Sequence, residues 1–226
     1  MHRLIMTSRV YQMSSAFYLD SNYGEDPENL SLWRFPAHRL EGEIIRNIIL
    51  ASGGNLDTTM AGKPFFPPLP ENVASASSRG RWVVTKDGPK VWRRSIYSYW
   101  RRAMPYPMFE VFDLPSLNSS CERRGTTTVP TQALTLMNSE FVTLQAKRFA
   151  ERLRKAGSND SSTQIRRAYR VALSRDPSPE EFERTIEFVG SQEDYHAGRA
   201  VEDPNLEALT DLCSVLLNLN EFVYVN

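Results

Sequence analysis

Four arginines and four large aromatic side chains are interspersed in the stretch VWRRSIYSYWRR, residues 91–102. Guanidinium groups bind carboxylates, sulfates and phosphates through paired hydrogen bonds, and they also stack on aromatic rings. The stretch therefore suits either a polyanion-binding surface or an ionic network inside the protein. Because neighbouring side chains on a strand point to opposite faces, Arg93 and Arg94 cannot both line one groove. We expect at least one of them to pair with Asp113 or Glu110, in the proline-bounded loop that follows.

A second arginine pair, Arg123 and Arg124, could bind the same two acids. With these arginines, the predicted cluster, an ionic network or a binding site, comprises Arg93, Arg94, Tyr97, Asp113, Arg123 and Arg124. Loss of one partner from a buried ion pair leaves an uncompensated charge and costs about 3–5 kcal/mol. Such a network would fix the loops that contribute to it.

Asp113 and Glu43 are also the candidates for acid–base catalysis. In this alternative the chain acts on an extracellular, sulfated polysaccharide, and Arg93 and Arg123 bind its anionic group. Two carboxylates about 5–10 Å apart in one open cleft would favour glycoside hydrolysis. A further alternative is polyanion or nucleic-acid binding by the basic aromatic stretch, which a net charge of zero disfavours for nucleic acid.

The sequence contains no signature for a metal, a haem or a nucleotide. Its two cysteines, Cys121 and Cys213, are too far apart for a CxxC metal pair, and its three histidines are scattered. No GxSxG, HExxH, CxxCH or glycine-rich phosphate loop is present. We therefore expect no metal site and no cofactor, and the sequence leaves open whether the chain is an enzyme.

The composition, 41% hydrophobic and 24% charged, is typical of a folded globular chain. The zero net charge conceals a segregation, because residues 79–102 carry a net charge of +7 and residues 180–211 carry −8. No apolar run is long enough for a membrane span, and the first residues lack the apolar core of a secretory signal. We expect neither a membrane span nor a signal peptide in this chain.

The elements that would position these residues are mostly helical, because apolar residues recur at helical spacing over residues 37–53 and 130–217. In the first segment the predicted apolar face comprises Leu40, Ile44 and Ile48, with Ile45 and Ile49 beside them. Its other face would hold Arg39, Glu43 and Arg46 in weak surface ion pairs. In the second segment the predicted core stripe comprises Val142, Ala146, Phe149 and Leu153, and Ser178 and Glu181 form a capping box.

The Asp-Gly pair in KDGP, between two β-rich runs, predicts a β-hairpin near residues 81–100. The expected fold class is therefore mainly α, a helical domain with a small β-hairpin and a long proline-rich loop. The expected division is an N-terminal helical part at 1–62, a proline- and serine-rich connector at 63–78, and the hairpin with the C-terminal helices at 79–226. We expect the first and last parts to pack as one domain.

Six motifs in a fixed order are distinctive. They are MHRLIMTS at 1–8, LWR.P..RLE.E.IR at 32–46, RRSIY at 93–97, FD.P at 112–115, RR..T..P.QAL.L.N at 123–138 and LC..LLN.NEF.YV at 212–225. Together they closely resemble domain of unknown function number fifteen fifty-three, also called the planctomycete-specific C-terminal domain, over nearly the whole chain. One departure is Asn47, because the helix motif often ends in IRD in similar sequences.

The resemblance implies a C-terminal module of a large exported bacterial protein, with a cytochrome-c-like segment and another uncharacterised domain before it. It implies an extracytoplasmic location and an upstream domain as partner, but no reaction. The resemblance starts at the first residues, so we expect the N-terminal part to be truncated and to expose apolar surface near Leu4 and Ile5. The leading hypothesis is a structural or interaction module, and an anionic polysaccharide is a second possible partner.

Overall fold

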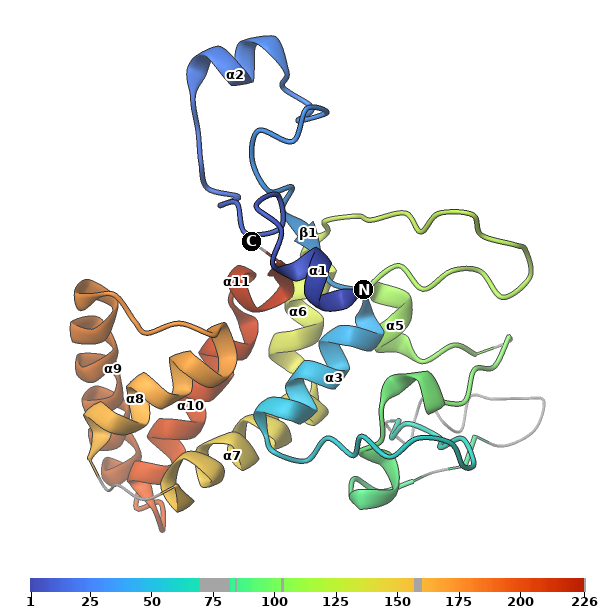
Figure 1. Cartoon of the computed structure of the whole chain (residues 1–226). Helices are drawn as coiled ribbons and strands as arrows, with labels where there is room; N and C mark the ends of the chain where they lie inside the picture. The colour runs from blue at the N-terminus through green and yellow to red at the C-terminus, as the bar shows by residue number, and fades with distance from the viewer. Residues whose placement is uncertain (70–81, 84, 103, 157–159, 226) are drawn as a thin grey trace. The chain divides into compact units, whose positions relative to one another are not determined.

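The structure is a computed structural model that describes residues 1–69, 82–83, 85–102, 104–156 and 160–225. The chain divides into two compact units. Unit 1 comprises Met1–Leu40 with Val223–Asn226, and unit 2 comprises Glu41–Phe222. The mainly α class that the sequence predicts is confirmed, since helices account for most of the regular structure (Figure 1).

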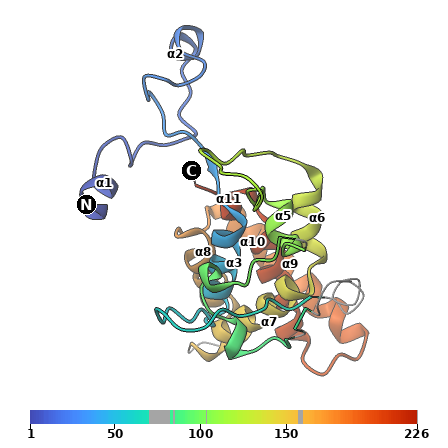
Figure 2. The same ribbon diagram turned by 90° about the vertical axis from the view of Figure 1, so that its right-hand side faces the viewer.

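Unit 2 contains most of the helices (Figures 1 and 2). Their bounds are α3 Gly42–Ser52, α5 Pro107–Val111, α6 Pro130–Asn138, α7 Glu140–Lys155, α8 Ser161–Leu173, α9 Pro179–Gly198, α10 Pro204–Asn218 and α11 Asn220–Val223, of which the last residue, Val223, is assigned to unit 1. Two short 3₁₀ turns, η1 Pro89–Val91 and η2 Ser95–Tyr97, precede α5. Proline opens four of these helices, α5, α6, α9 and α10, because its fixed backbone angle suits the first helical position.

Side-chain caps fix the starts of the later helices. The predicted capping box is confirmed, since the Ser178 hydroxyl accepts from the Glu181 N–H and the Glu181 carboxylate accepts from the Ser178 N–H. Asp160 caps α8 by accepting from the N–H groups of Ser162 and Thr163. Each cap satisfies N–H groups that the first helical turn leaves without an intrahelical partner.

The core of unit 2 forms where α10 packs against α7 and α9. All four residues of the predicted stripe on α7 are buried, namely Val142, Ala146, Phe149 and Leu153. Opposite them α10 buries Leu209, Cys213 and Leu216. The spacing of three and four residues explains both stripes, because it places these side chains on one helical face.

Helix α3 lies beside α5 and α7 (Figure 1), and its buried face differs from the predicted one. Ile45 and Ile49 are fully buried, whereas Ile44 is 40% exposed. Arg46 lies on the buried face and is only 1% exposed, so the prediction of a surface ion pair for Arg46 is wrong. The buried face includes Arg46 because residues 91–95 of the same chain supply acceptors for its guanidinium group.

Unit 1 contains little regular structure. Its elements are α1 His2–Met6, α2 Asp20–Glu25, and the two-residue strands β1 His38–Arg39 and β2 Tyr224–Val225. The strands pair antiparallel, with His38 opposite Val225 and Arg39 opposite Tyr224. Neither α1 nor α2 buries a residue, and Leu4 and Ile5 are 74% and 50% exposed, as the sequence predicts.

The small antiparallel pair is therefore present, but its predicted position near residues 81–100 is wrong. Among the described residues of that stretch, η1 and η2 stand where the second strand was expected, and isolated parallel bridges join Asp57 to Arg93 and Phe65 to Ser98. Residues 81 and 84, in the first predicted strand, lie outside the described part. Pro89 lacks an N–H and opens the turn η1 directly after the Asp-Gly pair, which prevents a hairpin ladder there.

The predicted connector, residues 63–78, is described only as far as residue 69. In this part Phe65 and Leu69 are buried. Phe65 donates its N–H to the Tyr97 carbonyl and accepts from the Tyr99 N–H. The first residues of the proline-rich loop thus pack on residues 97–99, and residues 70–78 lie outside the described residues.

Candidate functional site around helix α3

Arg46 is the centre of a polar cluster between α3 and the turns η1 and η2. Its Nη1 donates to the Arg93 carbonyl at 3.1 Å and to the Ser95 hydroxyl at 3.3 Å, and its Nη2 donates to the Val91 carbonyl. The guanidinium carbon lies 4.9 Å from the centre of the Phe65 ring. Backbone oxygens and an aromatic face therefore surround this cation.

No carboxylate contacts Arg46 among the described residues, and its buried Nε has no hydrogen-bond partner there. Burial lowers the pKa of Arg46 to about 10, because removal from water disfavours the charged form. The side chain is still protonated at neutral pH. A buried cation held by carbonyl groups fixes the backbone that supplies them, since loss of the cation would leave buried acceptors without donors.

Asn47, the next residue, holds the same turn. Its side-chain oxygen accepts from the Ser95 N–H at 2.8 Å and from the Ser95 hydroxyl at 2.9 Å. This contact requires an acceptor oxygen rather than a charge. The amide of Asn47 therefore supplies the acceptor that a carboxylate would supply.

Arg93 binds the chain at residues 59–63. Its Nη1 donates to the Lys63 carbonyl at 2.6 Å, and its Nη2 donates to the carbonyls of Ala61 and Thr59. The guanidinium carbon lies 4.0 Å from the centre of the Tyr97 ring, and the Tyr97 hydroxyl accepts from the Ala61 N–H. The expectation that Arg93 pairs with Asp113 or Glu110 is therefore wrong, because nearby carbonyls supply the acceptors.

Arg94 has a different partner from Arg93. Its Nη1 lies 3.2 Å from the sulfur of Met60, at an exposed position. Neither arginine reaches Asp113 or Glu110, and the strand alternation that was expected to send them to opposite faces is replaced by the turn η2. Met60 belongs to the same strip of chain that accepts from Arg93, so both arginines contact residues 59–63.

Arg124 forms the ion pair that the predicted cluster required, with other acids. Its Nη2 and Nη1 donate to the two carboxylate oxygens of Glu43 at 2.7 and 3.0 Å, and its Nη1 also lies 2.9 Å from Glu41. The hydrogen bond to Glu43 raises the pKa of Arg124 above its usual value. The Glu43 side chain is 14% exposed. Both oxygens of Glu43 accept from the Arg124 guanidinium group, so this side chain is engaged within the protein and does not face an open cleft with its oxygens free.

Asp113 closes the loop between α5 and α6. Its carboxylate accepts from the Thr127 N–H at 2.8 Å and from the Thr127 hydroxyl at 2.9 Å, and its backbone has a positive φ of 61°. Gln132 donates to the carbonyls of Val111 and Thr127, which holds the same two segments together. Arg123, the remaining member of the predicted cluster, is exposed.

The structure thus brings Arg93 and Tyr97 together, places Arg124 on Glu43, and gives Arg94 and Asp113 separate partners. Sequence reasoning missed Arg46 and Glu41 as members of the cluster. A signal for Arg46 was present in the sequence. The residue lies between Ile45 and Ile49 on a strongly apolar helix, and such a position suggests burial rather than a surface ion pair. The described residues contain no group of three or more potential metal ligands and no helix long and apolar enough to cross a membrane.

The fold and the cluster define a mainly α protein in which one helix, α3, organises its neighbouring loops through arginine contacts. A family model agrees with the resemblance in the motifs. The chain belongs to the PSD1 family, described as proteins of unknown function (DUF1553), whose model matches residues 1–189. The last motif, at 212–225, lies beyond the matched range. No curated protein and no solved structure matches the chain.

Proposed function

We propose that this chain is a structural and interaction module of an exported multidomain bacterial protein, as the resemblance to the planctomycete domain implies. Its partner is the domain upstream in the same parent protein, and its location is extracytoplasmic. One observation carries the proposal: the arginines of the cluster bind their own chain. Arg46, Arg93 and Arg124 bind carbonyls or acids of unit 2, which stabilises loops and leaves little of their hydrogen-bonding capacity for a substrate.

Unit 1 supports the interaction role. Large apolar side chains of its first segment are exposed, among them Leu4, Ile5, Met6, Phe17 and Tyr18. Exposed apolar surface of this extent is typical of sites that contact another protein. The upstream domain is the partner that the family resemblance indicates.

Hydrogen exchange tests the interaction. Amide exchange is measured for residues 1–37 in the chain alone and in the parent protein that carries the upstream domain. We expect slower exchange in the parent protein, because docking covers the apolar side chains and stabilises the short helices. Equal exchange rates in both proteins would contradict this partner. Helices α7 and α10 serve as internal references, because they belong to unit 2 and their exchange should not change.

A polysaccharide-degrading enzyme is the second candidate. It requires Glu43 or Asp113 to act as an acid or a base, and Glu43 is bound on both oxygens by Arg124. We expect no release of reducing ends from sulfated or unsulfated polysaccharides by the intact chain. Release that disappears in Glu43→Gln, while the melting temperature stays unchanged, would establish the enzyme and overturn the module.

Polyanion or nucleic-acid binding by residues 91–102 is the third candidate. In that stretch Arg93 uses its guanidinium group on the carbonyls at 59–63. A salt titration on a heparin or single-stranded DNA column tests it, with Arg94→Gln and Arg102→Gln as variants. We expect both variants to elute at the same salt concentration as the unmodified chain, because this proposal gives residues 91–102 no role in binding a polyanion.

A further inference from the structure

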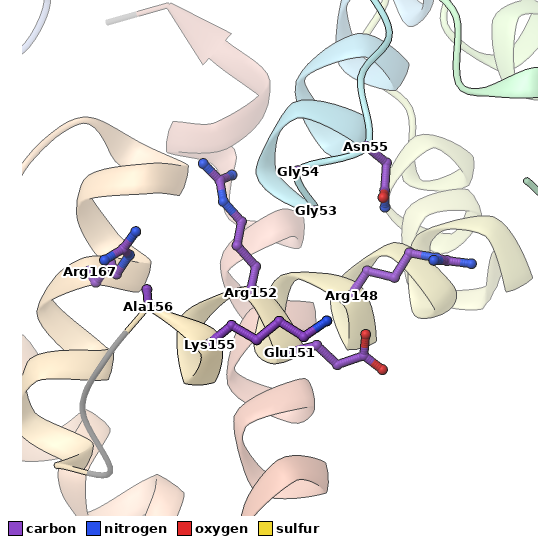
Figure 3. Close-up of a pocket in the computed structure, with 9 residues that line it drawn as sticks. All are labelled: Gly53, Gly54, Asn55, Arg148, Glu151, Arg152, Lys155, Ala156 and Arg167. Carbon is purple, nitrogen blue, oxygen red and sulfur yellow. The ribbon is translucent and has the colours of Figure 1, made fainter. Parts of the chain in front are cut away.

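A basic cleft lies between the end of α3 and one side of α7 and α8. Its volume is about 410 Å³. Its lining includes the turn at 53–55, three cationic residues of α7 and Arg167 of α8 (Figure 3). The residues of α7 are Arg148, Arg152 and Lys155. With Arg167 they place four cations around the cleft against one acid, Glu151.

Two of these cations, Lys155 and Arg167, make no polar contact with the described residues. The side chains of Lys155 and Arg167 are exposed and have no hydrogen-bond or ion-pair partner within the described residues. Arg148, by contrast, bonds to Asp87 at 3.3 Å and stacks 4.6 Å from the centre of the Trp92 ring. Lys155 and Arg167 therefore supply positive charge that no described residue pairs with.

Arg152 is held in place at the centre of the cleft. Its Nη1 donates both hydrogens, to the Ala51 carbonyl at 2.8 Å and to the Ser52 carbonyl at 2.9 Å, at the end of α3. The opposite edge, formed by Nε and Nη2, has no partner among the described residues. This edge presents two parallel N–H groups, the arrangement that binds two oxygens of a sulfate, phosphate or carboxylate.

Gly54 allows this placement. Its backbone has a positive φ of 77°, and a Cβ atom added there would lie 3.1 Å from the Cδ of Arg152. Figure 3 shows Arg152 rising from α7 between Arg167 and the Gly53–Gly54 turn. Because the side chain is fixed at one end by two carbonyls, little conformational entropy remains to be lost when its other edge binds an anion.

The backbone of the turn cannot bind the anion. The N–H groups of Gly53, Gly54 and Asn55 donate to the carbonyls of Ile49, Ala51 and Leu50. The Arg152 contact also has a structural purpose, since a cation near the last carbonyls of a helix offsets their partial negative charge. That purpose accounts for one edge of Arg152 and for neither Lys155 nor Arg167.

We propose that this cleft binds a tetrahedral oxyanion, a sulfate or phosphate group, which contacts the open edge of Arg152 and the side chains of Lys155 and Arg167. The group is either a free inorganic ion or an ester on a saccharide. Glu151 lies on the rim of the site and weakens binding through its like charge. This inference does not depend on the proposed docking of unit 1, because all its residues belong to unit 2.

Isothermal titration calorimetry of the whole chain tests the site, with sodium sulfate and sodium phosphate at an ionic strength held constant with chloride. The variant Lys155→Gln with Arg167→Gln should bind at least about tenfold more weakly, because it loses two charge-assisted contacts. Glu151→Gln should bind about threefold more tightly. Arg184→Gln, which removes an exposed cation of α9 outside the cleft, is the matched control and should leave affinity unchanged.

Two further arms identify the source of the anion. A disaccharide with one sulfate ester and its unsulfated counterpart are titrated in the same way. Tighter binding of the ester than of inorganic sulfate assigns the site to a saccharide, and binding of the inorganic ion alone assigns it to a free oxyanion. An equal loss of affinity in Arg184→Gln and in the double variant, or no binding beyond that of chloride, would overturn the proposal. Unchanged melting temperatures confirm that each variant is folded.

Discussion

Arg124 binds both carboxylate oxygens of Glu43, at 2.7 and 3.0 Å, across 81 residues of sequence. The contact joins the first turn of α3 to the loop that precedes α6. Two parallel N–H groups of Arg124 occupy both oxygens of Glu43 and fix the position of its side chain. The contact therefore favours a structural role for Glu43 over a catalytic one.

A double-mutant cycle measures this pair. Glu43→Gln and Arg124→Gln, singly and together, should give a coupling energy of about 1–2 kcal/mol in chemical unfolding. The reason is that the stability losses from mutating two residues in direct contact do not add. The pair Glu43→Gln and Arg123→Gln is the control, because Arg123 is exposed and lies next to Arg124 in sequence. A coupling near zero for the first pair would show that the contact contributes nothing in solution.

Replacement of Arg46 should be the most destabilising change in the cluster. Arg46→Ala leaves the carbonyls of Val91 and Arg93 without donors and opens a cavity, which should lower the free energy of unfolding by about 3–5 kcal/mol. Ile44→Ala, on the exposed side of the same helix, should cost less than about 1 kcal/mol. Urea unfolding followed by circular dichroism makes the comparison. Similar losses for both variants would mean that Arg46 is not buried as described.

Asn47 separates acceptor chemistry from charge. Asn47→Asp keeps an oxygen for the N–H and hydroxyl of Ser95, and Asn47→Ala removes it. We expect Asn47→Ala to cost about 1–3 kcal/mol, because the Ser95 N–H loses its partner, and Asn47→Asp to cost clearly less. The measurement is the same unfolding experiment. An equal cost for both variants would contradict the acceptor role.

Arg175 links the α8–α9 turn to α11 by binding two acids at once. Its guanidinium donates to both oxygens of Glu181 at 2.7 and 2.8 Å and to both oxygens of Glu221 at 2.6 and 2.7 Å. The hydrogen bonds from Arg175 lower the pKa of Glu181 from 4.5 to about 2. A carboxyl whose pKa is lower in the folded than in the unfolded chain stabilises the fold at any pH above its unfolded pKa. For Glu181 this stabilisation is lost as the pH falls from about 4.5 to about 2.

Thermal unfolding across that range tests the linkage. Arg175→Gln should melt well below the unmodified chain at pH 6, and the gap should narrow as the pH falls toward about 2, where Glu181 takes up a proton in both proteins. Arg184→Gln, which removes an exposed arginine of α9, should show no such narrowing. A constant gap for Arg175→Gln would assign its effect to packing rather than to the carboxylates.

Local patterns determined much of this protein. The helical class, the core stripe of α7 and the capping box at Ser178 all follow from the order of residues within one or two turns. Such features depend on spacing along a single helix, and a helix places residues three and four apart on one face in any context. The exposure of Leu4 and Ile5 was likewise predicted from the motifs at the start of the chain.

Only the tertiary structure decided the partners of the arginines. The sequence predicted that Arg93 and Arg94 diverge, but the acceptors of Arg93 are carbonyls at 59–63, and no residue pattern distinguishes one carbonyl from another. Pro89 and the packing of residues 57–65 replaced the predicted hairpin with short turns. Arg46 is buried because Val91, Arg93 and Ser95 converge on it, and convergence of segments 45 or more residues apart is a property of the folded chain alone.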